Sequence, residues 1–251
     1  MEYNYTTIKG LKTSYLKVGS GEPIILLHGL FSHCLEYERL INLLKKNFTV
    51  YGLNLPGFGD TVQPKRVFSI DDFADFVLKF MNKMGIKRTS IIAHSGGGIV
   101  ATDFSIKYPK RVKKLILVSA AGIKLNCSKR KIFYRLFVVQ PIVELFNFRE
   151  WRRLFALMGM NIFDFIVHPF RGNLWKSILK DMEVDYESSV RNLKVPTVLL
   201  WGDKDEIFPL DYARRFHKLI PKSKFIVVPG HHLWILLGPE KYWKRIKPKI
   251  I

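Results

Sequence analysis

The segment Ser90–Gly98 reads SIIAHSGGG and is the most informative stretch of the chain. A strand of small and apolar residues ends at Ala93, one serine follows, and a glycine run begins a helix. Small residues two positions before and after Ser95 allow a turn tight enough to expose its hydroxyl. The helix N-terminus offers free N–H groups to a developing oxyanion. The alternative is a glycine-rich phosphate loop, but neither GxxxxGK[ST] nor GxGxxG is present.

A second strand end carries a candidate oxyanion donor. The apolar run PIILL (Pro23–Leu27) continues directly into His28, Gly29 and Leu30. A glycine at this point lets the backbone approach a ligand closely, so the Leu30 N–H is a candidate donor. We expect His28 to shape the turn by hydrogen bonding within its own loop, and not to transfer protons.

Two more strand ends carry an acid and a base. Asp203 and Asp205 follow the strand VPTVLLW, and His231 and His232 follow the last strand. Either aspartate can instead cap its own loop, the commonest role of Asp in a turn. Adjacent histidines point in different directions, so at most one of the two can face Ser95. No HExxH motif and no third ligand at metal-site spacing accompanies them.

The pattern along the chain predicts an α/β fold. Helical patterns cover Leu35–Lys46, the segment from Ile70 to about Gly85, and the segment from the serine turn to Tyr108. Apolar strands that alternate with helices predict a mostly parallel sheet with helices on both faces. All four strand ends then lie on one edge of that sheet. The predicted strands are Tyr3–Ile8, Thr13–Val18, Pro23–Leu27, Phe48–Leu53, Ser90–Ala93, Lys114–Ser119, Val195–Trp201 and Lys224–Val228.

One segment interrupts the alternation. About 70 residues separate the strands that end near Ser119 and begin near Val195, whereas a crossover usually needs about a dozen or more. We therefore predict a core in two parts, residues 1–121 and 191–251, and a helical cap or lid over 122–190. The cap is rich in large apolar residues, which either line a lid with an apolar underside or pack it onto the core. They are Phe133, Phe137, Leu145, Phe146, Trp151, Phe155, Phe163, Phe165 and Trp175.

These motifs resemble the α/β-hydrolase family over nearly the whole chain outside the insertion. His28-Gly29-Leu30 matches the family's HG-x strand end, and Ala93–Gly97 matches its GxSxG nucleophile elbow. Asn54–Asp60 (NLPGFGD) resembles its DLPGFGxS loop, and Tyr108–Val112 resembles its YPxRV. Three positions depart from the pattern, namely Ala93 for the first elbow glycine and Asn54 and Thr61 for the commoner Asp and Ser.

The resemblance implies roles for particular residues. The acid is Asp205, the third residue after the glycine of WGxxD, and the base is His232, seven residues before Pro239-Glu240. Ser95 would be the nucleophile, and its serine argues against the dehalogenase and epoxide-hydrolase branches, which use a carboxylate. The N–H groups of Leu30 and Gly96 would form the oxyanion hole. The supporting positions are His28, Gly29, His94 and Gly97.

These roles predict a serine esterase or lipase-like enzyme acting on a small hydrophobic ester, acyl or aromatic, with no metal or organic cofactor. Thioesterases, carbon–carbon bond hydrolases and perhydrolases use the same three residues and remain open. So does an acyltransferase, in which an alcohol replaces water. A non-catalytic binding protein on this fold is a further alternative.

Length, composition and charge limit the number of domains and the cellular compartment that we expect. The 251 residues suit one large core. No secretory signal, no uninterrupted apolar span of about 20 residues and no CxxC spacing is present, so we expect a cytoplasmic protein. The net charge of +20 gathers in Lys107–Lys114, Lys124–Arg135 and Lys241–Lys249. We interpret it as a solvated surface: no nucleic-acid module occurs, and the insertion's cations are compatible with reversible contact to an anionic membrane. The sequence does not indicate an oligomeric state.

Overall fold

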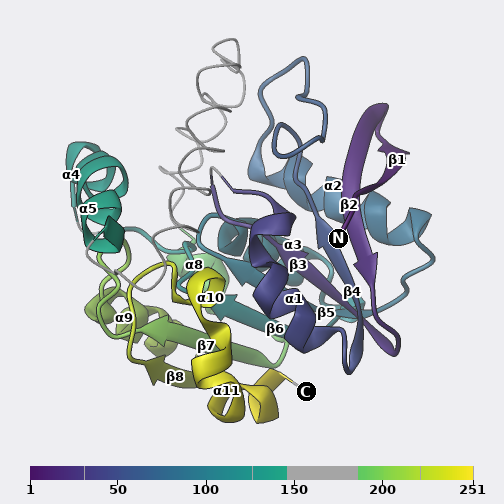
Figure 1. Cartoon of the computed structure of the whole chain (residues 1–251). Coiled ribbons are helices and arrows are strands. Elements are labelled where there is room, and N and C mark those ends of the chain that lie inside the picture. Colours follow the sequence, from purple (N-terminus) through teal and green to yellow (C-terminus); the bar gives the residue numbers. More distant parts are fainter. Residues whose placement is uncertain (31, 126, 146–185, 221, 251) are drawn as a thin grey trace.

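The computed structural model describes residues 1–30, 32–125, 127–145, 186–220 and 222–250. Its centre is one eight-stranded sheet in the order β1-β2-β4-β3-β5-β6-β7-β8 (Figure 1). The pairs β1-β2 and β2-β4 are antiparallel, and all the other pairs are parallel. The strands are β1 (Asn4–Ile8), β2 (Leu11–Val18), β3 (Glu22–Leu27), β4 (Phe48–Leu53), β5 (Thr89–His94), β6 (Val112–Val118), β7 (Thr197–Gly202) and β8 (Lys224–Val228).

Apolar side chains on both faces of the sheet explain the continuous apolar strands. In β3, Ile24 and Leu26 pack into one core cluster, while Ile25 and Leu27 pack into the other. Successive side chains of a strand point to opposite faces, so a strand covered on both sides has no polar alternation. The predicted mostly parallel sheet is confirmed, and all eight predicted strands are present.

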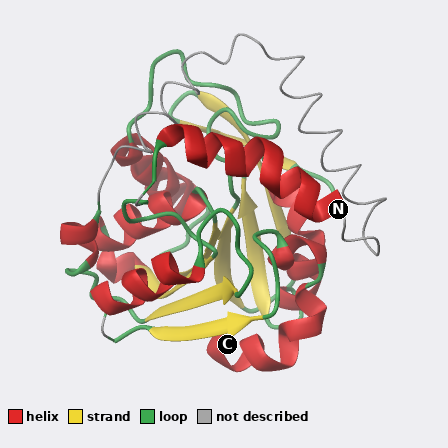
Figure 2. Cartoon of the chain, turned by 90° about the vertical axis from the view of Figure 1, so that its left-hand side faces the viewer, coloured by secondary structure: helices red, strands yellow, loops and turns green. Residues whose placement is uncertain are grey.

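Helices cover both faces (Figure 2). Helices α2 (Ile70–Lys83), α3 (Gly97–Lys107), α8 (Glu187–Val190) and α9 (Leu210–Leu219) contribute to one cluster. The opposite face is covered by α1 (Glu38–Leu44), α10 (Trp234–Leu237) and α11 (Trp243–Ile250). Short helical turns are η1 (Cys34–Tyr37), η2 (Pro109–Arg111) and η5 (Pro239–Tyr242).

Local sequence signals set several boundaries. Lys9 and Gly10, both at positive φ, form the turn of the antiparallel hairpin between β1 and β2. Ser69 and Asp72 form a reciprocal capping box at the start of α2. The helix predicted over Leu35–Lys46 is divided into the 3-10 turn η1 and helix α1, because a tighter turn often begins a helix.

Of the predicted cap, residues 122–190, the structure describes 122–125, 127–145 and 186–190, and the last of these ranges contains α8. Helix α4 (Lys129–Tyr134), the π-helical turn η3 (Arg135–Val139) and helix α5 (Gln140–Leu145) follow β6 and stand apart from the sheet (Figure 1). The predicted cap aromatics from Phe146 to Trp175 lie outside the described residues. Within the ranges that are described, no helix is both long and apolar enough to cross a membrane.

Candidate active site

Ser95 lies at a strained turn between β5 and α3. Its φ is 49°, a left-handed conformation that serine rarely adopts and that costs free energy. The surrounding backbone fixes the turn, because the Ser95 N–H donates to the Val118 carbonyl at 3.1 Å and the Ala121 N–H donates to the Ser95 carbonyl at 2.9 Å. The side chain retains slight exposure, with 9% of the residue accessible to solvent.

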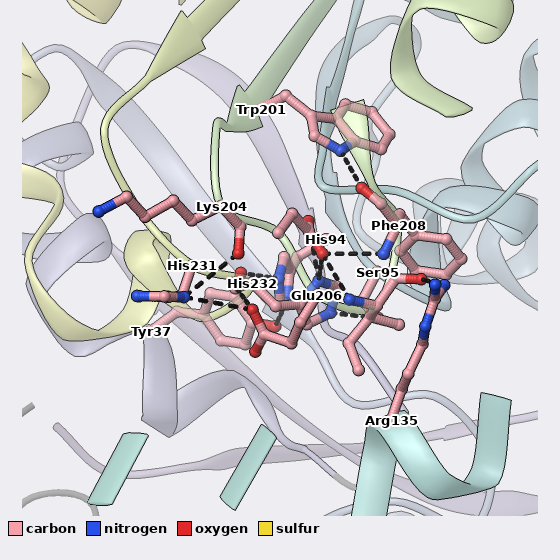
Figure 3. A network of polar contacts seen from close by, with 12 residues as sticks. Tyr37, His94, Ser95, Arg135, Trp201, Lys204, Glu206, Phe208, His231 and His232 are labelled. Atoms are coloured by element: carbon pink, nitrogen blue, oxygen red, sulfur yellow. Dashed lines mark hydrogen bonds and ion pairs between the residues drawn. The ribbon is translucent and has the colours of Figure 1, made fainter. Parts of the chain in front are cut away.

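The structure brings His232 to this serine (Figure 3) and Asp205 to His232. His232 Nε2 lies 3.0 Å from Ser95 Oγ, and His232 Nδ1 lies 3.1 Å from each carboxylate oxygen of Asp205. Both residues are buried. The three side chains come from the ends of β5, β7 and β8, which lie on one edge of the sheet. Since the carboxylate accepts a hydrogen bond from the Nδ1–H group, the other ring nitrogen, Nε2, carries the lone pair that can accept the hydroxyl proton.

Asp205 is fixed by its own loop. Its Oδ1 accepts hydrogen bonds from the N–H groups of Ile207 at 3.0 Å and Phe208 at 2.8 Å. Trp201 Nε1 donates to the Phe208 carbonyl at 2.8 Å and so anchors the far end of the loop to β7. The neighbouring Asp203 is exposed and accepts the Gly230 N–H at 2.9 Å. Asp203 therefore caps the turn, and Asp205 is the aspartate in contact with His232.

The adjacent histidines, His231 and His232, have different partners. His231 is partly exposed, and its Nδ1 lies 3.2 Å from the Lys204 carbonyl and 3.4 Å from Glu206 Oε2. The same Glu206 oxygen accepts the His232 N–H at 3.4 Å. Burial raises the pKa of Glu206. Sequence reasoning missed this second carboxylate, although its position next to Asp205 was visible.

The two candidate oxyanion donors lie against each other. A Cβ placed on Gly96 would lie 2.6 Å from the Leu30 side chain, and one on Gly97 would lie 2.4 Å from the His28 carbonyl. A Cβ on Gly29 would lie 3.0 Å from Ser95 Cβ. Within the described ranges, the N–H groups of Leu30 and Gly96 donate to no protein acceptor. Two backbone N–H groups beside a serine hydroxyl would suit a developing negative charge, and the oxyanion hole formed by Leu30 and Gly96 stays a prediction.

His28 hydrogen-bonds within its own turn. Its Nδ1 donates to the Gly29 carbonyl at 2.7 Å, and its Nε2 accepts the Leu55 N–H at 3.1 Å. The Gly29 carbonyl belongs to the same peptide group as the Leu30 N–H, so this bond also orients the candidate donor. Burial lowers the pKa of His28 to about 4, so the ring is neutral at neutral pH.

His94 is also buried and hydrogen-bonded at both ring nitrogens. Its Nδ1 lies 2.7 Å from the Tyr37 hydroxyl and its Nε2 lies 3.2 Å from the His232 carbonyl. Burial lowers the pKa of His94 well below its usual value. Tyr37 was not predicted, since no motif or spacing connects η1 with the serine turn.

The departures from the family's loop pattern have a structural explanation. Asn54 accepts the Cys34 N–H with Oδ1 and donates to the Ser14 hydroxyl with Nδ2, both at 2.8 Å. An aspartate lacks that second donor. Thr61 donates to the Asn54 carbonyl at 2.9 Å and accepts the Ser14 N–H at 3.0 Å. The loop before α2 is thus held to β2 and to the start of η1 by the side chains of Asn54 and Thr61.

Across the described parts of the chain, no three His, Cys, Asp or Glu side chains are grouped so as to hold a metal ion.

Arg135 of η3 reaches the same loop as Asp205 and donates to the Ile207 carbonyl at 3.4 Å. Figure 3 shows this arginine beside the site.

Comparison with known proteins defines the family. The model of the alpha/beta hydrolase fold family matches residues 22–139 and 170–239, which is most of the chain. The protein therefore belongs to the α/β-hydrolase-fold family, as its motifs and sheet indicate. Among curated relatives, the 2-hydroxy-6-oxo-2,4-heptadienoate hydrolase of Pseudomonas putida is 22% identical over 261 residues, covering 94% of this chain and 91% of that protein.

Solved structures agree on the fold. A bacterial membrane phospholipase A has a TM-score of 0.82 at 21% identity and is matched over 98% of this chain and 84% of its own. A thermophilic esterase from Thermogutta terrifontis has a TM-score of 0.80 at 22% identity, with 99% and 98% covered. The chain is thus a member of a hydrolase family whose similar structures include an esterase and a phospholipase.

Proposed function

We propose that this protein is a serine hydrolase that cleaves a carboxylic ester through Ser95, His232 and Asp205. The observation that carries the proposal is the 3.0 Å contact between Ser95 Oγ and His232 Nε2, with Asp205 on the opposite ring nitrogen. A serine hydroxyl is a weak nucleophile at neutral pH and needs an adjacent base that is itself oriented by a third group. The three side chains meet that requirement.

In the first half-reaction, Ser95 Oγ attacks the ester carbonyl carbon while His232 Nε2 takes the hydroxyl proton. Asp205 keeps the second ring proton on Nδ1 and stabilises the imidazolium that results. The carbonyl oxygen gains negative charge and accepts hydrogen bonds from the Leu30 and Gly96 N–H groups. Removing one such donor typically costs about 2.7–4 kcal/mol of transition-state stabilisation.

The first half-reaction ends when His232 gives its proton to the leaving alcohol, the tetrahedral species collapses, and the acyl group stays on Ser95. In the second half-reaction, water loses a proton to His232 and attacks the acyl carbon. His232 then returns that proton to Ser95 Oγ as the second tetrahedral species collapses, which releases the acid and restores the hydroxyl. Neither half-reaction needs an electron acceptor or a metal.

We further propose a small hydrophobic ester, with an acyl or aromatic group, as substrate. The side chain of Phe208 packs against His232 with ring centroids 5.6 Å apart, so an apolar surface borders the reacting atoms. The likeness to an esterase and a phospholipase is consistent with this substrate class. A series of p-nitrophenyl esters of increasing acyl length would define it.

A second candidate is carbon–carbon bond hydrolysis on the same residues. It is favoured by the similarity, over 94% of this chain, to a 2-hydroxy-6-oxo-2,4-heptadienoate hydrolase. Comparing turnover of a vinylogous diketone with turnover of the best ester separates the two candidates. Adding a competing alcohol during ester turnover and analysing the products distinguishes a hydrolase from an acyltransferase.

The direct test is the Ser95→Ala variant. We expect it to lose ester turnover and labelling by a fluorophosphonate while it keeps its circular dichroism spectrum. Ser119→Ala is the matched control: Ser119 is fully buried at the end of the neighbouring β6, and its hydroxyl has no partner in the described part of the chain. Normal turnover by Ser95→Ala would refute the assignment.

A further inference from the structure

We propose that Tyr37 and His94 are positioning residues that hold the oxyanion loop, the serine turn and the His232 loop in one arrangement. The proposal rests on the serine-hydrolase function above, since positioning matters only if these three segments react together. Three hydrogen bonds carry it, from Gly29 N to Tyr37 Oη at 3.0 Å, between Tyr37 Oη and His94 Nδ1 at 2.7 Å, and between His94 Nε2 and the His232 carbonyl at 3.2 Å. Each bond joins a different pair of segments.

The direction of the chain of bonds follows from its two ends. A carbonyl oxygen only accepts, so His94 Nε2 carries the proton that is donated to the His232 carbonyl. In a neutral ring Nδ1 is then an acceptor, and the Tyr37 hydroxyl donates to it. The Tyr37 oxygen in turn accepts the Gly29 N–H. The four groups thus form one continuous series with a single donor direction.

Burial keeps this series in one protonation state. Tyr37 and His94 are almost fully enclosed, at 0% and 2% exposure. Burial lowers the pKa of His94 and raises the pKa of Tyr37, so both side chains stay neutral across the working range of pH. A charged His94 would lose its Nδ1 acceptor and would repel the imidazolium formed on His232 during the reaction.

The series reaches the reacting groups through covalent neighbours and through packing. Gly29 precedes Leu30, whose N–H is the proposed oxyanion donor, and His94 precedes Ser95. The rings of His94 and His232 also pack together, with centroids 4.9 Å apart and planes tilted by 38°. Tyr37 and His94 therefore influence the placement of all three groups that must meet in the transition state, without touching the substrate.

The test compares two buried tyrosines. In Tyr37→Phe, the Gly29 N–H and His94 Nδ1 lose their shared partner, and we expect kcat to fall about 10- to 100-fold with KM changed less than about twofold. Tyr212→Phe is the control. Its equally buried hydroxyl accepts the Gly122 and Ile123 N–H groups at 3.1 Å, so it loses comparable bonds but joins none of the three segments. We expect it to lower Tm and to keep kcat within about twofold.

Two His94 variants test the direction of the bonds. His94→Gln retains an N–H near the position of Nε2 and can still donate to the His232 carbonyl, whereas His94→Leu removes both contacts. We expect kcat to decrease from wild type to His94→Gln to His94→Leu. We also expect the ring of His94 in the wild-type protein to remain a neutral Nε2–H tautomer from pH 5 to 8 by nitrogen NMR.

The outcomes separate the two proposals. If wild-type protein neither hydrolyses esters nor reacts with a fluorophosphonate at Ser95, the serine-hydrolase function itself is refuted, and the positioning role with it. If wild type is active but Tyr37→Phe keeps its kcat, or if Tyr212→Phe loses as much, the positioning role alone is refuted. Titration of the His94 ring between pH 5 and 8 would also overturn it.

Discussion

The candidate site, at the carboxyl edge of the sheet, and an ion pair at the opposite, amino edge differ in how far their side chains are buried. At the carboxyl edge, His28, His94, Asp205 and His232 are buried and each makes at least two hydrogen bonds. At the amino edge, Glu22 at the start of β3 pairs with Lys113 at the start of β6, at 2.5 Å, and both side chains are more than half exposed. The same parallel topology produces both edges.

This difference indicates that the free-energy cost of burying polar groups is concentrated at the candidate site. A buried polar group costs free energy unless it is fully hydrogen bonded, so the carboxyl edge holds only if its bonds form together. An exposed ion pair exchanges its bonds with water at little cost. Substitutions at the carboxyl edge should therefore have large effects that depend on geometry, and those at the amino edge small ones.

The largest contrast is expected within one loop of the carboxyl edge. In Asp205→Asn the amide cannot support the Nδ1–H tautomer of His232, and we expect kcat for ester hydrolysis to fall by about 10⁴-fold. In Asp203→Asn the amide oxygen still accepts the Gly230 N–H, and activity should stay within about threefold. Steady-state kinetics with one p-nitrophenyl ester measures both. Equal losses in the two variants would contradict the assignment of roles.

The next contrast concerns close packing at the serine turn. In Gly97→Ala the new methyl group would lie 2.4 Å from the His28 carbonyl and 2.9 Å from the Leu27 carbonyl, both backbone atoms that cannot move independently. We expect a loss of about 3 kcal/mol in the free energy of unfolding, although alanine favours a helix. Activity should fall as well, because the oxyanion loop is displaced.

Gly85→Ala is the matched control for that variant. Gly85 has a φ of +70°, and a Cβ there would meet nothing within 4 Å. It therefore reports the conformational cost alone, about 1 kcal/mol, and should leave kcat unchanged. Urea unfolding of both variants separates contact from conformation. A Gly97→Ala protein no less stable than Gly85→Ala would show that β3 and α3 are not packed as the structure has them.

The sequence predicted the fold because its signals are local. Continuous apolar runs such as PIILL identify strands covered on both faces, and a glycine run after Ser95 identifies the serine turn. The strand order could not be obtained from periodicity, since β4 lies between β2 and β3 only through long-range pairing. The chain from Phe146 to Trp175, on which the predicted lid depends, lies outside the described residues.

The site residues that lie in a recognisable motif could be predicted from the sequence. A residue that reaches the site through packing between distant segments could not. Ser95, His232 and Asp205 each follow a strand, so a parallel sheet places them on a common edge. Spacing alone did not decide whether Asp203 or Asp205 contacts the histidine, and the hydrogen bonds of the two aspartates distinguish them. Tyr37 has no sequence signal, because its contacts to Gly29 and His94 depend on how η1 packs across the strand ends.

The carboxyl edge should also make stability depend on pH. Burial lowers the pKa of His28 to about 4, whereas a histidine in the unfolded chain titrates near its usual value of about 6.5. Between these values the unfolded chain binds a proton that the folded protein does not, so stability is complete above about pH 6.5 and falls as the pH drops toward 4. A shift of this size corresponds to about 3 kcal/mol. His94, whose pKa is also lowered, acts in the same direction.

Urea unfolding at intervals from pH 4.5 to 7.5 measures that dependence. In His28→Asn the side-chain amide retains a donor for the Gly29 carbonyl but does not titrate. We expect this variant to be less stable at pH 7.5 and to show a shallower decrease toward acid, with the remainder due to His94 and the carboxylates. Identical slopes in wild type and variant would mean that His28 is accessible to protons in the folded state.

The smallest effect is expected at the amino edge. Lys113→Ala and Glu22→Ala each remove one partner of an ion pair whose side chains are 51% and 64% exposed. Because solvent and salt screen such a pair, each variant should change the free energy of unfolding by less than about 0.5 kcal/mol, and the double variant should show a coupling of similar size. Raising the salt concentration should remove that coupling. A coupling above about 1 kcal/mol would show that the amino edge is as tightly ordered as the site, and the contrast between the two edges would then not arise from burial.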